Sequence, residues 1–341
     1  MSRRSFLAWT AALLASGDAA YQSIVQGVAA QGQATAPGDI VVTLLGTGSP
    51  EPSATRFGPA TLVQAGGLTL LFDAGRGVTV RLHQLRLSFG RGLDAVFLTH
   101  YHSDHLGGLP DLWLTGYLRG APFASRSKPL RLWGPSDGTG TPGILTRLVN
   151  GLRETFAADI RMRVAEEGID IAATEIETHD FQGDGVVFEE AGVKVTAFVV
   201  NHGEAVKPSV GYRIDHGPRS VTISGDTRFD ENLIRHAAGT DVLIHEVMAI
   251  APDWAGRPEF KSVIEHHTSP EEAGQVFTRV SPKLAVYTHF ILIATSGADI
   301  IPRTRSTYSG PLEAGEDLMR ITIGDEVKVQ RWDPQHRGYS P

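Results

Sequence analysis

The sequence predicts an α/β fold in which short buried strands alternate with helices. Short apolar runs rich in Val, Ile and Leu recur along the chain, and segments with helical spacing lie between them. Polar residues of metal-binding types directly follow several of these runs. The 341 residues, with 41% hydrophobic and 20% charged side chains, are enough for one large globular domain with a buried core.

In the first part of the chain, apolar alternation and turn residues delimit the expected elements. We expect a strand over 40–45 with a turn over 46–50, a hairpin built from 61–63 and 68–72, a helix over 78–87, and a buried strand over 93–99 that ends in a loop. The apolar segment 109–118, which contains Trp113 and Tyr117, is expected to be a helix that roofs this loop.

The second part continues the alternation. We expect strands over 130–134, within 186–200, and over 209–215, 221–224, 242–244 and 284–288, with a helix over 143–157. Ser269-Pro270-Glu271-Glu272 is a capping box with proline at the first helical position, which predicts a helix to about Val280. In the final segment, 296–341, only 327–332 has the pattern of a strand.

A cluster of metal-binding residues follows the strand predicted over 93–99. The segment His100-Tyr101-His102-Ser103-Asp104-His105 contains three histidines and one aspartate. In an extended loop start, His100 and His102 point to the same side. Imidazole nitrogen and carboxylate oxygen are ligands that zinc accepts. This spacing therefore predicts a metal site, with room for a second ion near Asp104 and His105.

Three further candidates stand at the ends of later strands: His202, Asp226 and His289. Alone, each is more often structural, because strand-end histidines are commonly satisfied core residues and Gly-Asp-Thr commonly forms turns. Their recurrence after the four-ligand cluster favours a shared site with two ions.

The N-terminus has the pattern of an export signal. Ser2-Arg3-Arg4-Ser5-Phe6-Leu7 is a twin-arginine pattern, and the apolar stretch over 7–15 is too short to cross a bilayer. We therefore expect residues 1–36 to be a twin-arginine signal and linker, residues 37–341 to form the domain, and the mature protein to be periplasmic or secreted without a membrane anchor. The chain has no cysteine, so disulfides and thiolate ligands are excluded. Its net charge of −7 argues against broad nucleic-acid binding.

These motifs together resemble the metallo-β-lactamase fold superfamily, in its ribonuclease Z-like and arylsulfatase-like branch. The matching segments occur in the family's order: 44–50, 72–75, 99–105, 201–203, 224–227, 245–246, 267–269 and 288–290. The resemblance implies an αββα sandwich, with two mixed sheets flanked by helices, and a centre for two divalent metal ions, expected to be zinc. Other ions that accept His and Asp ligands, such as manganese or iron, remain open.

The resemblance also implies a role for each site residue. His100, His102 and His202 would hold one ion, Asp104, His105 and His289 the other, and Asp226 would bridge them. Asp73 would be a buried structural carboxylate that orders the ligand loop. His267 would stand beside the leaving group, oriented by Glu246. A surface position at a helix start is the alternative for His267, since His266 adjoins it.

The sequence leads us to expect a hydrolase that acts on small-molecule esters. Water shared by two ions loses a proton near neutral pH, so a bridging hydroxide can attack while Asp104 takes a proton and His267 assists the leaving group. Short ribonuclease Z proteins carry a tRNA-binding arm between the ligands matching His202 and Asp226, and this short interval has no room for one. We therefore expect an exported hydrolase of aryl sulfate or related phosphate esters. Four apolar residues could form a pocket for an aromatic group, although residues of these types more often belong to the core: Trp113, Tyr117, Phe290 and Ile291.

Several alternatives stay open. A phosphodiesterase or a lactonase would use the same site, and a ribonuclease Z-like endonuclease is a more distant choice. A metal-binding protein without turnover is a different class, which the presence of Asp104, Asp226 and His267 together disfavours. The oligomeric state, monomer or homodimer, is also open.

Overall fold

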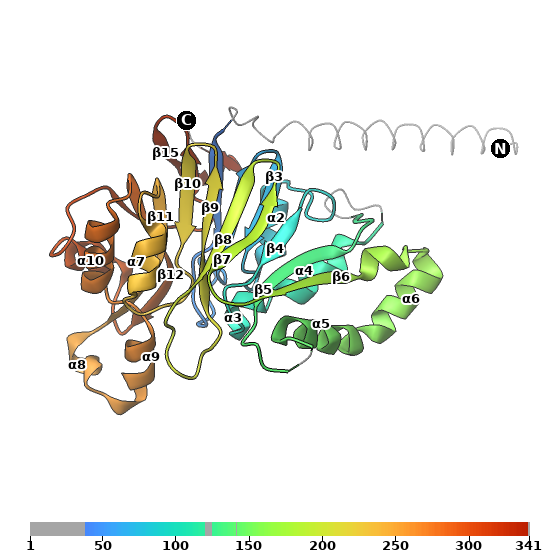
Figure 1. Cartoon of the computed structure of the whole chain (residues 1–341), viewed down its shortest axis with the longest axis horizontal. Coiled ribbons are helices and arrows are strands. Elements are labelled where there is room, and N and C mark those ends of the chain that lie inside the picture. The colour runs from blue at the N-terminus through green and yellow to red at the C-terminus, as the bar shows by residue number, and fades with distance from the viewer. Residues whose placement is uncertain (1–37, 120–124, 141, 340–341) are drawn as a thin grey trace, which may run out of the picture.

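The computed structural model describes residues 38–119, 125–140 and 142–339. Two mixed β-sheets stack face to face, and helices cover the outer face of each (Figure 1). This arrangement confirms the predicted αββα sandwich. The predicted export signal lies outside the described residues, and the structure bears on neither that signal nor the predicted domain boundary.

The first sheet is built mainly from the N-terminal half of the chain. Its strand order is β15-β14-β1-β2-β3-β4-β5-β6. The strands are β1 (Ile40–Gly46), β2 (Ala60–Ala65), β3 (Leu68–Phe72), β4 (Ala95–Phe97), β5 (Leu130–Pro135), β6 (Ile176–Phe181), β14 (Arg320–Ile323) and β15 (Val327–Gln330). β3 to β6 pair in parallel, which brings their carboxyl ends to one edge of the sheet.

The second sheet has the order β13-β12-β11-β10-β9-β8-β7. Its strands are β7 (Gly185–Glu190), β8 (Val193–Val199), β9 (Val210–His216), β10 (Arg219–Ile223), β11 (Val242–Ile250), β12 (Leu284–Ile293) and β13 (Leu312–Ala314). β10, β11 and β12 are parallel neighbours, so the residues that follow β10 lie near β11 and β12. A separate two-stranded sheet pairs β16 (Trp332–Asp333) with β17 (Gly338–Tyr339).

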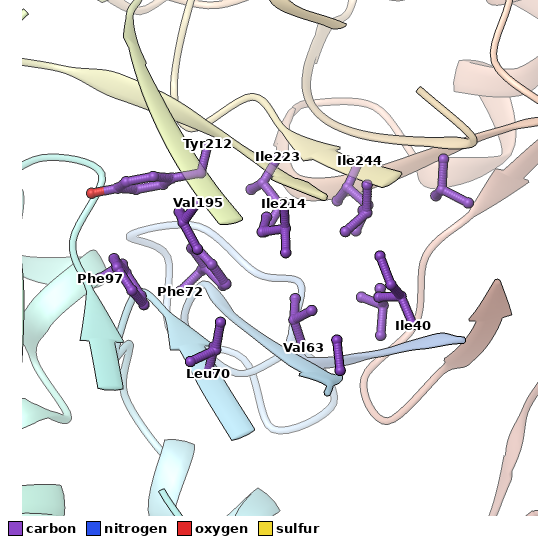
Figure 2. Close-up of a cluster of buried hydrophobic side chains, with 14 of the residues drawn as sticks. Ile40, Val63, Leu70, Phe72, Phe97, Val195, Tyr212, Ile214, Ile223 and Ile244 are labelled. Carbon is purple, nitrogen blue, oxygen red and sulfur yellow. The ribbon is translucent and has the colours of Figure 1, made fainter. Parts of the chain in front are cut away.

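The central core fills the space between the two sheets. Figure 2 shows side chains of the first sheet, such as Phe72 and Val63, facing Ile214 and Ile244 of the second. Alternation along each strand produces this face, because every second side chain points inward. Burying so many aliphatic and aromatic groups stabilises the fold by about 25 cal/mol per Å² of apolar surface removed from water.

Helices complete the two outer layers (Figure 1). Apolar residues of α2 (Val78–Gln84), α4 (Leu109–Gly116) and α5 (Ile144–Thr155) pack on the outer face of the first sheet, and α6 (Ala157–Glu167) follows α5. α7 (Glu231–Ala237), α10 (Pro270–Val280) and α11 (Ile300–Thr304) pack on the second sheet. Short helices α3 (Ser103–Leu106), α8 (Pro252–Ala255) and α9 (Lys261–His266) lie in connections. Within the described ranges, every helix is too short or too polar to span a bilayer.

The structure differs from the sequence-based expectation in the C-terminal segment and in one helical stretch. The segment 296–341 contains β14, which pairs with β1 and extends the first sheet, although its pattern did not predict a strand. β6 was also not predicted. Neither was α6, a helix in which no residue is fully buried, so its sequence shows little helical periodicity.

Candidate metal centre

The predicted ligands converge from both sheets. His100 and His102 follow β4, and Asp104 and His105 lie in α3. His202 lies in the loop between β8 and β9, Asp226 follows β10, and His289 lies within β12. Because the sheets face each other, side chains from these distant segments meet at one edge of the sandwich.

The first group contains His100, His102, His202 and Asp226, whose potential ligand atoms lie within 4.8 Å of one another. His102 Nδ1 is 3.0 Å from His100 Nε2 and 3.2 Å from His202 Nε2. His100 and His202 are buried, whereas His102 is exposed. Three imidazole nitrogens facing one point form the donor set that zinc prefers.

The second group contains Asp104, His105 and His289, again with ligand atoms within 4.8 Å. Asp226 stands between the groups. Its Oδ2 atom is 3.3 Å from both His105 Nε2 and His289 Nε2, and 3.7 Å from His202 Nε2. One carboxylate oxygen therefore faces both groups, as a bridging ligand would.

The charges of the centre fit divalent ions. The carboxylates of Asp104 and Asp226 are buried, and among the described residues only histidines lie within ion-pair distance of them. Buried carboxylates without a cation are costly. His105 Nε2 is buried and lacks a hydrogen-bond partner within the described part of the chain, so it too is available as a ligand.

The protonation states of the buried histidines also suit metal binding. Burial holds the pKa of His100 well below its usual value, and burial lowers the pKa of His202 to about 4. Both imidazoles are therefore neutral near pH 7, which is the form that binds metals. For His105, burial lowers the pKa, but the Asp226 and Asp73 carboxylates outweigh it and the net shift is strongly upward. These carboxylates favour positive charge at the position where an ion would lie.

The carboxylate of Asp73 holds the ligand loop in position. Its Oδ1 accepts a hydrogen bond from Thr99 N at 2.8 Å, and its Oδ2 lies 2.8 Å from His105 Nδ1. Such a carboxylate fixes the tautomer of a metal-binding histidine. Asp73 adopts a φ of 60°, a backbone conformation that few residues other than glycine and asparagine tolerate. The geometry agrees with the structural role expected for this residue.

A β-bulge aims His289 into the centre. β11 and β12 pair in register up to Glu246↔Thr288 and resume at Val247↔Phe290, so His289 is the extra residue. Its φ of 44° is a strained value for histidine. Bulges redirect side chains in this way at functional sites.

His267 and Glu246 form a pair next to the metal groups. His267 Nδ1 lies 3.1 Å from Glu246 Oε1, and both side chains are buried. His267 also lies within 4.8 Å of Asp226 and His289, measured between potential ligand atoms. Burial lowers the pKa of His267, but the Glu246 carboxylate outweighs it and the net shift is upward. The structure thus places His267 inside the centre and not at the surface.

Several supporting residues were not singled out from the sequence. The Thr99 hydroxyl is 3.0 Å from His100 Nδ1, the His266 carbonyl is 3.1 Å from His202 Nδ1, and Thr268 N donates to Glu246 Oε1 at 3.0 Å. Two of these contacts are made by backbone atoms, so no side-chain pattern could have revealed them. The position of Thr99, between the strand and the ligand cluster, was the one available signal.

Three of the four side chains considered for an apolar pocket belong to hydrophobic cores instead. Trp113 and Tyr117 are fully buried, and the Trp113 indole donates to the Thr174 carbonyl at 2.8 Å. Trp113 belongs to the core between α4 and the first sheet, because its position in the helix faces the sheet. Tyr117, which directly follows α4, packs with Ile169 and Ala173 in a separate small cluster. Phe290 is also buried, with the Arg56 guanidinium 4.2 Å above its ring, whereas Ile291 is partly exposed.

An αββα sandwich with clustered His and Asp ligands at one edge defines the class of metal-dependent hydrolases. Comparisons with known proteins agree. Residues 69–290 match the family model described as "Beta-lactamase superfamily domain". Ribonuclease Z of Mycobacterium sp. (strain KMS) is 35% identical over 298 residues, which cover 85% of this chain and 99% of that protein. Ribonuclease Z of Mycobacterium marinum is 34% identical over 288 residues, covering 83% and 99%.

Solved structures show the same fold. The metallo-beta-lactamase fold protein YhfI from Bacillus subtilis aligns with a TM-score of 0.61 at 19% identity, over 83% of this chain and 99% of that one. Human tRNase Z, short form, aligns with a TM-score of 0.61 at 22% identity, with the same coverage. The chain belongs to the metallo-β-lactamase superfamily and is ribonuclease Z-like within it.

The coarse functional prediction, a metal-dependent hydrolase acting on ester bonds, is confirmed. The finer preference for sulfate esters is not supported, because the curated relatives reported above are named Ribonuclease Z. The comparisons favour the alternatives that the sequence left open over the sulfatase, and in particular the ribonuclease Z-like endonuclease that was the more distant choice.

Proposed function

We propose that this protein is a metal-dependent phosphodiesterase of the ribonuclease Z type, which cleaves a phosphodiester bond in RNA. The observation that carries the proposal is the 35% identity to a protein named Ribonuclease Z over 99% of that protein's length. The intact set of seven His and Asp side chains in the two metal groups supports it.

The residues of the centre suit this reaction. When bound, two divalent ions lower the pKa of a water molecule and stabilise negative charge on the oxygens of the attacked phosphorus. Asp104 lies where it can both ligate and accept a proton. His289 Nε2 lies 3.2 Å from Asp104 Oδ2, so both atoms could bind the same ion.

His267 is the proposed general acid. Glu246 accepts a hydrogen bond from Nδ1 of the imidazole, which leaves Nε2 directed away from Glu246. The negative charge of Glu246 favours the protonated form of His267, so a proton is available for the departing oxygen. Glu246 Oε1 also accepts hydrogen bonds from Thr268 N and Thr227 N, which fix the carboxylate in position.

The lack of a long arm between His202 and Asp226 does not weigh against RNA as a substrate. In the described structure this interval forms the hairpin of β9 and β10. The alignment with the mycobacterial relative, a protein named Ribonuclease Z, covers 99% of that protein. This similarity supports nucleic acid as the substrate in place of the predicted small ester.

The test is a panel of substrates for the zinc-loaded protein: a tRNA precursor, an unstructured RNA, an aryl phosphodiester and an aryl sulfate. We expect cleavage of the tRNA precursor and of the aryl phosphodiester, with kcat/KM on the aryl phosphodiester at least roughly tenfold above that on the aryl sulfate. An Asp226→Asn variant is the control for contaminating nucleases. Faster cleavage of the aryl sulfate, or equal RNA cleavage by the variant, would overturn the proposal.

We also propose that the protein is exported, on the basis of the twin-arginine pattern at Arg3 and Arg4 and the apolar stretch that follows. The expected location is the periplasm or the medium.

A further inference from the structure

A small cavity, lined mostly by buried residues, adjoins the metal centre. Its volume is about 20 Å³. Its lining combines metal-centre residues, including Asp226, Glu246 and His289, with core residues such as Phe72 and Ile223. A cavity needs roughly 10–15 Å³ to hold one water molecule, and that water needs two to four polar partners.

Three of the lining residues each bury one polar atom that has no hydrogen-bond partner in the described part of the chain. His105 Nε2 belongs to the second metal group; the other two atoms are His289 Nδ1 and Glu246 Oε2. His289 is 2% exposed and Glu246 is 1% exposed, so bulk water cannot satisfy them. A buried carboxylate oxygen and a buried imidazole nitrogen are expensive to leave unpaired.

The second ring nitrogen of His289 and the second carboxylate oxygen of Glu246 both have polar neighbours. Nε2 of His289 faces the Asp104 and Asp226 carboxylates at 3.2 and 3.3 Å. Oε1 of Glu246 accepts hydrogen bonds from the His267 ring, Thr268 N and Thr227 N. If Nε2 of His289 is the metal-binding nitrogen, Nδ1 of the neutral ring carries the proton and is a donor. His289 and Glu246, which both line the cavity, thus supply one unpaired donor and one unpaired acceptor.

We infer that the cavity holds one internal water molecule, which accepts a hydrogen bond from His289 Nδ1 and donates one to Glu246 Oε2. The water fixes the tautomer of His289 and keeps the lone pair of Nε2 directed at the metal. Thr61 and Thr288 also line the cavity and offer hydroxyl groups for a further hydrogen bond.

This arrangement gives Glu246 a second task. Through Oε1 it orients His267, and through Oε2 and the water it orients His289. Glu246 is then a positioning residue shared by the leaving-group histidine and a metal ligand. Metal-binding histidines commonly pass their second N–H to such an outer partner. The inference is independent of which ester the enzyme cleaves.

A high-resolution crystal structure of the zinc-loaded protein tests the water directly. We expect density for one ordered water within hydrogen-bonding distance of both His289 Nδ1 and Glu246 Oε2. A dry cavity, or a water that contacts neither atom, would overturn the inference whether or not the protein is active on any substrate.

A pair of variants tests the consequence. Ala60 lines the cavity, whereas Ala65, at the other end of β2, does not, and both are 2% exposed. Ala60→Val should displace the water and weaken zinc binding about tenfold or more in a chelator competition, since outer partners of metal ligands contribute 10–100-fold. Ala65→Val controls for overpacking and should leave zinc affinity unchanged. Equal affinity in the two variants, with the water displaced in Ala60→Val, would contradict the positioning role. The crystallographic result stands even if a variant does not fold.

Discussion

At the scale of single residues, the centre depends on buried carboxylates that hold the metal-binding histidines. One carboxylate oxygen of Asp73 accepts a hydrogen bond from Thr99 N, and the other lies within hydrogen-bonding distance of His105 Nδ1. A single side chain therefore positions both the start and the end of the ligand loop. Its left-handed backbone conformation is one that asparagine also tolerates. The carboxylate can therefore be neutralised with little change to the backbone.

We expect Asp73→Asn to fold and to bind zinc 10–100-fold more weakly than the unmodified protein, because the His105 ring loses its charged partner. Chelator competition monitored by a zinc indicator measures the change. Asp215→Asn, a change in β9 where the carboxylate pairs with Arg213, is the control and should bind zinc normally. Unaltered zinc affinity in Asp73→Asn would show that this carboxylate does not support the ligand loop.

A second residue-scale prediction concerns the proton that His267 supplies. His267→Ala should reduce kcat by about 10²–10⁴ on a phosphodiester with a poor leaving group. The loss should be much smaller with a p-nitrophenyl leaving group, which departs without protonation. Metal content should not change, and Glu246→Gln should show the same dependence on the leaving group with a smaller loss. An equal loss on both substrates would argue that His267 acts only on folding or metal binding.

At the scale of elements, the ends of the parallel strands present the site. Ligands directly follow the carboxyl ends of β4 and β10, whereas His289 lies in the middle of β12, where the bulge turns it inward. The turn after β10 requires a glycine. Gly225 has a φ of 61°, and a Cβ atom there would lie 2.4 Å from the Val210 carbonyl oxygen. Asp226 is the next residue, so the conformation of this glycine sets the position of the bridging carboxylate.

Gly225→Ala should therefore destabilise the protein by about 1–3 kcal/mol and weaken metal binding. Gly151→Ala is the matched control: Gly151 lies within α5 and has open space around the position of a Cβ atom. That change should leave metal binding intact and leave stability unchanged or raise it by about 0.5–1 kcal/mol. Denaturant unfolding of both variants gives the comparison, and similar stabilities would refute the account of the turn.

Sequence patterns predicted these elements unevenly. The strand before the ligand cluster was predictable because its apolar run ends in metal-binding side chains, at Thr99-His100. β12 was predicted only as far as Thr288, because the polar His289 interrupts an apolar run that continues to Ile293. β14 was missed because its short apolar pattern, interrupted by Arg320 and Thr322, becomes a strand only through pairing with β1. Trp113 and Tyr117 were misassigned because a sequence shows the apolar side of a helix but not what that side covers.

At the scale of the whole molecule, the metal centre lies where the two sheets meet. His100 and His102 come from the first sheet, whereas His202, Asp226 and His289 come from the second. Bound ions would therefore link two layers that otherwise touch through their apolar faces. Ligands that bind only the folded state stabilise it by mass action.

Zinc should raise the midpoint of thermal unfolding of the chelator-treated protein. At a free concentration near 100 times the Kd, the stabilisation is about 2.7 kcal/mol. Differential scanning calorimetry with and without zinc measures it, and Asp226→Asn should show a much smaller shift. A zinc response of equal size in that variant would mean that the ions bind elsewhere.

The proposed export concerns the whole protein. Replacing both arginines, Arg3→Lys and Arg4→Lys, should block translocation, because the twin-arginine route requires that pair. Cell fractionation should then find the variant in the cytoplasm and the unmodified protein outside it. Identical fractionation of the two proteins would reject the signal.

The central claim is that the His and Asp side chains of the two groups form a dinuclear centre that hydrolyses phosphodiesters. Titrating the metal-free protein with zinc while following hydrolysis of an aryl phosphodiester tests it most directly. We predict that activity rises to a plateau at about two ions per chain, and that Asp226→Asn stays inactive throughout. Full activity without metal, or a plateau at one ion per chain, would contradict the claim.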